Sequence, residues 1–168
     1  FAGLRPVVCA NLPYNVTSPL LTAFLTAGCF DTFTVMIQRE VARRLCARPG
    51  TADYGALTVF VQWHAEPELL FDVPPHCFVP QPKVTSAVVR MDRRAAPPAQ
   101  ADDERFFFRT VRAAFAQRRK TLSNALRSGF SELDRADIAS AMEEALLPPA
   151  VRGETLSIAQ FAALSNAL

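Results

Sequence analysis

Asn11, Pro13 and Tyr14 stand together in the stretch NLPYN, directly after the short apolar run VVCA. This stretch offers an amide, a rigid kink and an aromatic face at one place. In an open α/β sheet, ligands bind outside the carboxyl ends of the strands, where such a turn would lie. The alternative is an ordinary turn in which Asn caps a helix and Tyr packs. The five residues alone do not decide between the two interpretations.

A second aromatic residue, Phe78, lies in the loop CFVPQPK, where Pro80 and Pro82 restrict the backbone. Such stiffening fixes the direction of an aromatic side chain at little entropic cost, although the loop could also be a plain rigid crossover.

The sequence lacks several common catalytic motifs: it has no GxSxG, no HExxH, no P-loop and no GxGxxG. His64 and His76 have no partner at ligand spacing, so we expect no metal site.

Composition indicates a globular chain, with 168 residues of which 50% are hydrophobic and 20% charged. No apolar run approaches the roughly 20 residues that span a bilayer, and the start FAGLRP has neither Met nor a signal pattern. We therefore expect no membrane partner and a cytoplasmic protein, of which the chain is a fragment.

The four cysteines lie far apart in apolar segments and are predicted to be reduced thiols in the core.

Charge is unevenly distributed along the chain. The segment 131–154 is rich in acids, whereas the segment 105–127 contains seven cations and no acid, namely Arg105, Arg109, Arg112, Arg118, Arg119, Lys120 and Arg127. Without acids between them, these cations are predicted to lack local partners. A polyanion is the natural ligand of such a surface.

The first part of the chain alternates between strand and helix patterns. Two buried parallel strands are predicted at 6–12 and 32–38, each followed by a helix. The first helix can be capped by Thr17 or Ser18 and ends at Gly28, and the second covers 39–48. The segment 54–65 fits either a strand or a helix. Strands at 68–73 and 84–91 are predicted to run antiparallel at the edge of the sheet.

The later part has a different organisation. A linker is predicted at 93–101, and the residues after it have helical periodicity. The expected core positions are Phe107, Val111, Ala114, Phe115, Leu122, Leu126, Ile138, Met142 and Leu146. We therefore predict an α/β domain at 1–92 and a small all-helical domain at 102–168.

Six segments follow one another along the chain: NLPYN, IQREVARRL, YGALTVFVQ, FVPQPKVTSAVVR, AFAQRRKTLSNAL and LSIAQFAAL. In wording and in order, they resemble the motifs of the KsgA family of ribosomal RNA adenine dimethyltransferases. The resemblance covers essentially the whole chain. It implies the C-terminal half of a Rossmann-like class I methyltransferase sheet followed by a helical domain, and it implies a helix for 54–65.

The resemblance also implies a chemistry, the transfer of methyl groups from S-adenosylmethionine to N6 of adenosine. By match to the family motif, the Asn11 side chain and the Leu12 carbonyl accept the N6 hydrogens, and Pro13 stiffens the turn. Tyr14 and Phe78 would stack on the two faces of the extruded base. Asn11 would also lie beside the cofactor. Gln38 and Glu40 match another family motif, but ordinary roles at a strand end and a helix start explain them equally well.

One departure from the family is large, because the family's acidic, Gly-rich cofactor loop precedes NLPY and has no counterpart here. We therefore expect the 168 residues alone to be inactive and not to bind S-adenosylmethionine, and we expect the strand at 6–12 to be an unprotected sheet edge.

The implied partner is small-subunit (16S) ribosomal RNA in the 30S precursor particle, and the full-length protein is expected to be a monomer. Six of the cations are predicted to contact the RNA: Arg105, Arg109, Arg112, Arg118, Arg119 and Lys120. Two alternatives remain: an Erm-type methyltransferase of large-subunit RNA, and a non-catalytic RNA-binding or assembly factor.

Overall fold

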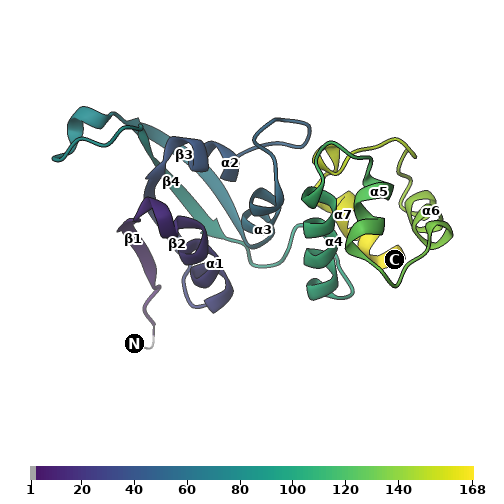
Figure 1. Cartoon of the computed structure of the whole chain (residues 1–168). Helices are drawn as coiled ribbons and strands as arrows, with labels where there is room; N and C mark the ends of the chain where they lie inside the picture. The colour runs from purple at the N-terminus through teal and green to yellow at the C-terminus, as the bar shows by residue number, and fades with distance from the viewer. Residues whose placement is uncertain (1–2) are drawn as a thin grey trace. The chain divides into compact units, whose positions relative to one another are not determined.

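The computed structural model describes residues 3–168, which form two compact units (Figure 1). One unit contains the chain up to Ala47 together with Phe60–Ala96, and the other contains Arg48–Val59 together with Pro97–Leu168. The structure thus groups 48–59 with the helices, whereas the predicted first domain ran unbroken over 1–92. Residues 1 and 2 of that predicted domain lie outside the described residues.

The first unit is built on a four-stranded sheet in the order β1-β2-β4-β3. β1 pairs with β2 in parallel, and β4 pairs antiparallel with both β2 and β3, which confirms the predicted mixed topology. The strands are β1 (Val7–Asn11), β2 (Thr32–Gln38), β3 (Ala65–Val73) and β4 (Ser86–Arg93). A short 3₁₀ helix, η2 (Pro75–Cys77), lies in the connection from β3 to β4.

Two helices belong wholly to this unit: α1 (Thr17–Ala27) and α2 (Arg39–Leu45). A third helix, α3 (Ala56–His64), belongs to it from Phe60 on. The undecided segment 54–65 is therefore mostly helical, as the family resemblance implied. In β2, Phe33, Val35 and Ile37 are fully buried while the residues between them are half-exposed, which is the alternation of a strand with one covered face. Phe24 of α1 stacks on Phe33, with ring centroids 6.4 Å apart, so α1 covers that face.

β1 lies at the edge of the sheet, where Val7 is 62% exposed. This confirms the unprotected edge that was expected from the missing cofactor half, and it contradicts the buried strand that was predicted from the apolar run alone. The cysteines were expected in the core, but Cys9, Cys29 and Cys77 are exposed and Cys46 is half-buried. Apolar neighbours in sequence do not bury a thiol when the strand or loop that carries it lies at an edge. Burial raises the pKa of the Cys46 thiol.

The second unit contains α4 (Glu104–Ala116), α5 (Leu122–Gly129), α6 (Arg135–Glu144), η3 (Gly153–Thr155) and α7 (Ile158–Ala167). Side chains cap three of the helix starts: Asp103 at α4, Asp134 in a capping box at α6, and Ser157 in a capping box at α7. All the predicted core positions are buried except Phe115, which is half-buried, and Leu146, which is 89% exposed.

Tyr54 explains why residues 48–59 belong to the helical unit. Its side chain is 1% exposed, its hydroxyl donates to the Leu156 carbonyl at 2.9 Å, and its ring packs edge-on against Phe115. The partners of Tyr54 lie far from it in sequence, so local sequence patterns do not reveal these contacts. Within residues 3–168, no helix is both long enough and apolar enough to cross a bilayer.

Candidate functional site

The turn that follows β1 is held by backbone hydrogen bonds. The buried Leu12 donates its amide to the Met36 carbonyl at 3.0 Å, which continues the pairing of β1 with β2. The Pro13 carbonyl accepts from the Val16 amide at 3.2 Å and from the Thr17 hydroxyl at 3.0 Å. Thr17 therefore braces the turn and does not cap α1, whose N-cap is Val16 without a side-chain bond. The turn is a rigid platform that includes the short helix η1 (Tyr14–Val16).

Tyr14 is fixed by a residue that the sequence analysis did not identify. Its hydroxyl lies 2.6 Å from the hydroxyl of Ser86, which is fully buried at the start of β4. Within VTSAVV, Ser86 has the pattern of an ordinary strand residue, and no local signal marks it. Because 72 positions separate the two residues, only the fold reveals the contact.

The loop that precedes β4 brings Phe78 to the same place. Its amide donates to the Pro75 carbonyl at 3.2 Å, and its side chain is half-buried. Seven residues line one pocket of about 260 Å³, namely Asn11, Leu12, Pro13, Tyr14, Phe78, Pro80 and Pro82. The five residues predicted from the sequence as catalytic therefore meet in a single hollow. Its volume lies just below the range of about 300–1,000 Å³ that is typical of sites for drug-sized ligands.

The pocket combines two aromatic side chains with an exposed amide, and it contains no titratable acid or base other than the Tyr14 phenol. Such a lining can hold a planar, neutral group between aromatic faces and accept hydrogen bonds from it. It is not equipped for catalysis by a strong base. The arrangement suits positioning of a reacting group.

The same residues do not complete a site for a nucleoside cofactor. Such sites use a Gly-rich turn and a carboxylate for the ribose, and none of the seven lining residues is acidic or Gly. Asn11, exposed at the end of β1, is the only predicted cofactor contact in the chain.

Gln38 and Glu40 have local roles in the structure. Gln38 is the N-cap residue of α2, and Glu40 forms an ion pair with Arg44 at 2.8 Å, one turn later in the same helix. Neither residue is among the seven that line the pocket. These positions support the ordinary interpretation.

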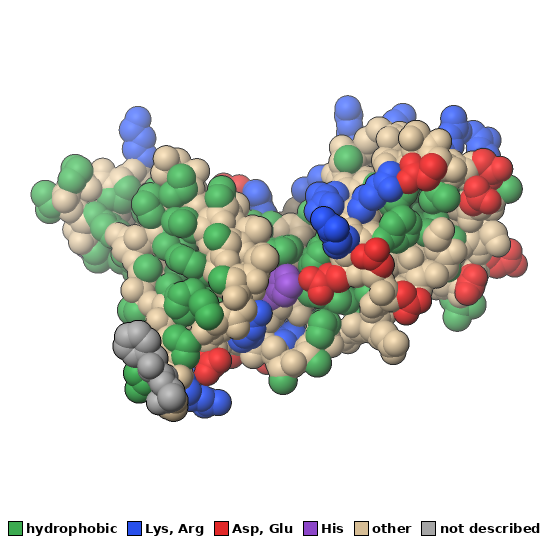
Figure 2. All heavy atoms as spheres, turned by 90° about the horizontal axis from the view of Figure 1, so that it is seen from below, with side chains coloured by type: hydrophobic (Ala, Val, Ile, Leu, Met, Phe, Trp, Pro, Cys, Tyr) green, Lys and Arg blue, Asp and Glu red, His purple; other side chains and the backbone are tan. Residues whose placement is uncertain are grey.

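The cations of 105–127 do not all lack partners, which corrects the prediction from sequence. Arg109 forms an ion pair with Glu132 at 2.5 Å and lies over the Phe130 ring at 4.3 Å. Arg118 donates to the Ala52 carbonyl at 2.8 Å and lies 3.5 Å from Glu154. Glu132 and Glu154 come later in the sequence, and the fold brings them next to these arginines. Figure 2 shows acidic and basic side chains side by side on the helical unit.

Five cations of the segment remain, and they are exposed and form no ion pair within residues 3–168: Arg105, Arg112, Arg119, Lys120 and Arg127. The first four of these are predicted RNA contacts. The segment 115–120, which contains Arg118, Arg119 and Lys120, lines a second hollow of about 480 Å³. This hollow is strongly cationic and faces solvent. No cluster of metal-ligating side chains is found in the described part of the chain.

The chain is similar to proteins that modify ribosomal RNA. Residues 5–167 match the family model described as ribosomal RNA adenine dimethylase. The chain is 49% identical over its whole length to "Ribosomal RNA small subunit methyltransferase A" of Caldanaerobacter subterraneus, and 48% identical over 96% of its length to the protein of the same name from Geobacillus thermodenitrificans. It spans 62% and 56% of the lengths of these two relatives.

Solved structures agree with these matches. A dimethyladenosine transferase from Plasmodium falciparum superposes on 98% of the chain with a TM-score of 0.78 at 22% identity, which shows the shared fold, and the chain covers 66% of that protein. The 23S rRNA methyltransferase ErmE superposes on 99% of the chain with a TM-score of 0.66 at 26% identity, and 68% of that protein is covered. Because the family model matches nearly every residue, the chain belongs to the ribosomal RNA adenine dimethylase family.

Proposed function

We propose that this chain forms the adenosine-binding wall and the RNA-docking unit of an enzyme that dimethylates N6 of adenosines in small-subunit ribosomal RNA. One observation carries the proposal: Asn11, Leu12, Tyr14 and Phe78, which lie up to 67 positions apart in sequence, line one pocket. A chain without such a function has no reason to expose an amide beside two aromatic faces.

The pocket suits the chemistry of an exocyclic amine. The lone pair of adenine N6 is delocalised into the ring, so N6 is a poor nucleophile. The Asn11 side-chain oxygen and the Leu12 carbonyl accept the two N6 hydrogens, which favours a pyramidal nitrogen and aims its lone pair. Tyr14 and Phe78 hold the base by stacking. S-adenosylmethionine supplies the methyl group, and in this chain only Asn11 would contact it.

The small subunit is favoured as the substrate by the names of the relatives. Curated proteins that are 44–49% identical to the chain are named for the small subunit. The ErmE structure, named for 23S RNA, is only 26% identical and superposes with a lower TM-score than the Plasmodium transferase. We extend the proposal to the 30S precursor particle as the partner. A purely non-catalytic factor would not need the pocket, and the predicted monomeric state stays a prediction.

The proposal can be tested with a chimera. In it, the chain replaces the matching segment of the Caldanaerobacter relative. Methyl transfer from labelled S-adenosylmethionine to unmodified small subunits is measured. Stacking is worth roughly 1–3 kcal/mol per base, so Tyr14→Ala or Phe78→Ala should each slow transfer about tenfold or more. Phe71→Ala serves as the matched control, since Phe71 is 57% exposed and lies outside the pocket.

Cofactor affinity, measured by calorimetry, should be the same for all these variants. If Phe78→Ala methylates at the unaltered single-turnover rate, the pocket does not hold the base and the proposal fails. Equal losses in Phe71→Ala and Phe78→Ala would also contradict it, because they would indicate a general effect on folding.

A further inference from the structure

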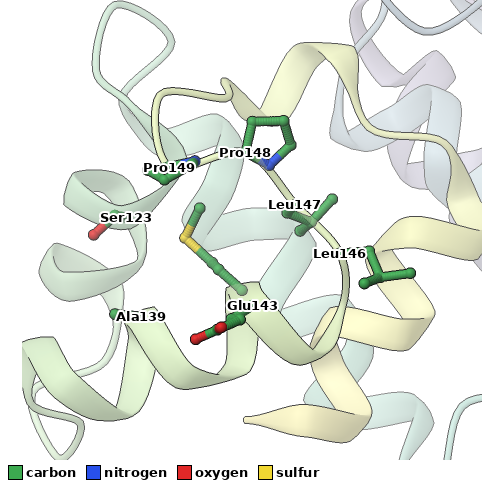
Figure 3. Close-up of a pocket in the computed structure, with 8 residues that line it drawn as sticks. Ser123, Ala139, Glu143, Leu146, Leu147, Pro148 and Pro149 are labelled. Atoms are coloured by element: carbon green, nitrogen blue, oxygen red, sulfur yellow. The ribbon is translucent and has the colours of Figure 1, made fainter.

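A hollow of the helical unit shares no lining residue with the cationic segment 115–120. It is a groove of about 630 Å³ (Figure 3). Figure 3 shows Ala139 and Glu143 on one side and Pro148 and Pro149 on the other. The groove is lined by Ser123 of α5, by Ala139, Met142 and Glu143 of α6, and by Leu146, Leu147, Pro148 and Pro149 of the following loop.

The end of α6 has an unusual residue at the lip of this groove. The Leu147 amide donates to the Met142 carbonyl at 2.8 Å, and the Leu146 amide donates to the Glu143 carbonyl at 2.9 Å. These bonds define a Schellman motif, whose left-handed position is usually occupied by Gly. Here that position is Leu146, with φ of 55°, and among the described residues it is the only one other than Gly with positive φ.

Packing within the chain does not explain this choice. Leu147 and Met142 occupy the two positions whose apolar contact usually accompanies such a motif, and they are only 6% and 3% exposed. Leu146 is 89% exposed, so its side chain gains nothing from burial. A left-handed backbone is unfavourable for a branched side chain, and an exposed leucine contributes no compensating contact. Residues held in such conformations cluster at functional sites.

The charge of the groove identifies the occupant. Among its eight lining residues, all of them described, Glu143 is the only charged one. A phosphate would meet an anion here and no cation, so RNA does not fit, in contrast to the hollow at 115–120. An apolar floor next to a carboxylate fits a peptide that carries an apolar side chain beside a lysine or arginine.

We propose that this groove docks a basic, apolar segment of a partner protein, with Leu146 and Met142 contacting its apolar side chain and Glu143 pairing with its cation. This inference does not depend on the proposed catalytic function. The occupant is a protein segment rich in lysine or arginine. A second copy of the chain and RNA are the competing occupants.

Fluorescence anisotropy of the 168-residue chain tests the proposal with three labelled 14-residue peptides. One alternates leucine and lysine in an amphipathic helical pattern, one replaces each lysine with glutamate, and one replaces each leucine with glycine. Only the leucine–lysine peptide should bind. Leu146→Gly should weaken it at least tenfold, and Glu143→Gln should weaken it severalfold and reduce its salt dependence.

Two matched variants on α6 locate the binding. Ala139→Trp fills the groove and should abolish binding, whereas Ala136→Trp, at an exposed position outside the lining, should not. Leu146→Gly should also leave the urea midpoint of unfolding unchanged or raise it, because Gly suits the left-handed position.

Three results would overturn the proposal. A lower urea midpoint for Leu146→Gly would mean that the leucine stabilises the chain itself. Equal binding of the leucine–lysine peptide to all variants would place its site elsewhere. Binding of a labelled RNA oligonucleotide that Ala139→Trp abolishes, or self-association in sedimentation that Ala139→Trp abolishes, would assign the groove to the competing occupant.

Discussion

The hydrogen bond between Tyr14 and Ser86 gives a test of how the adenosine wall is positioned. The two hydroxyl oxygens are 2.6 Å apart and join the turn after β1 to the first residue of β4. Ser86 is fully buried, whereas Tyr14 is half-buried. Because the two hydroxyls differ in their access to water, removing one or the other should have unequal effects on stability.

Tyr14→Phe leaves the buried Ser86 hydroxyl without its partner. An unsatisfied buried polar group costs about 1–3 kcal/mol. Ser86→Ala leaves the phenol, which can reach water, so only the net hydrogen bond of about 0.5–1.5 kcal/mol is lost. The double variant has no orphaned hydroxyl, and its destabilisation should be smaller than the sum of the single effects by about 1 kcal/mol.

Urea unfolding provides the assay, followed by fluorescence of Trp63, the single tryptophan, which is buried in α3. All four members of the cycle are compared at one pH. Additive effects, or a larger effect for Ser86→Ala than for Tyr14→Phe, would refute the reasoning. In the methylation chimera, Tyr14→Phe should be milder than Tyr14→Ala, because the stacking face is retained.

Two further predictions concern the helical unit. Burial raises the pKa of Tyr54 to about 12 from 10.0, so the folded state holds this proton longer than the unfolded state does. The free energy of unfolding should be unaffected by this group below pH 10 and should fall by about 1.4 kcal/mol per pH unit as pH rises from 10 to 12; urea unfolding of Tyr54→Phe should lack that fall. In binding of small subunits at several salt concentrations, Arg119→Ala/Lys120→Ala should reduce the salt slope by about 1.4 to 1.8, whereas Arg109→Ala should mainly lower the urea midpoint. An equal fall in the free energy of unfolding between pH 10 and 12 for Tyr54→Phe and the unaltered chain would contradict the first expectation. Equal salt slopes for Arg119→Ala/Lys120→Ala and Arg109→Ala would contradict the second.

The parts of the fold that local physics determines were predictable. The turn after β1, the stop of α1 at Gly28 with φ of 73°, and the apolar periodicity around Phe107 and Leu126 each follow from residues near one another in sequence. The meeting of Tyr14 with Phe78 was implied by resemblance, and the structure places both at one pocket. A local pattern alone would not have joined them.

The features that the sequence did not predict depend on contacts between residues far apart in sequence or on where a helix ends. Ser86 has a strand pattern, and its role depends on a partner 72 positions away. Periodicity placed Leu146 in the core, but α6 ends at Glu144, and the left-handed turn that follows directs the side chain to solvent. Helical periodicity predicts burial only for as long as the helix continues.

The ion pairs of the helical unit also limit how many of its cations can bind RNA phosphates. A cation already held by an acid, such as Arg109 with Glu132, must give up that partner to bind a phosphate, so it adds little to net attraction. Four of the six predicted RNA-binding cations remain without an ion pair among the described residues. If each of these four contacts one phosphate, the salt slope from this surface is about 2.8 to 3.6. A markedly steeper measured slope would require phosphate contacts elsewhere in the protein, because Arg109 and Arg118 are engaged in holding the helices and residues 48–59 together.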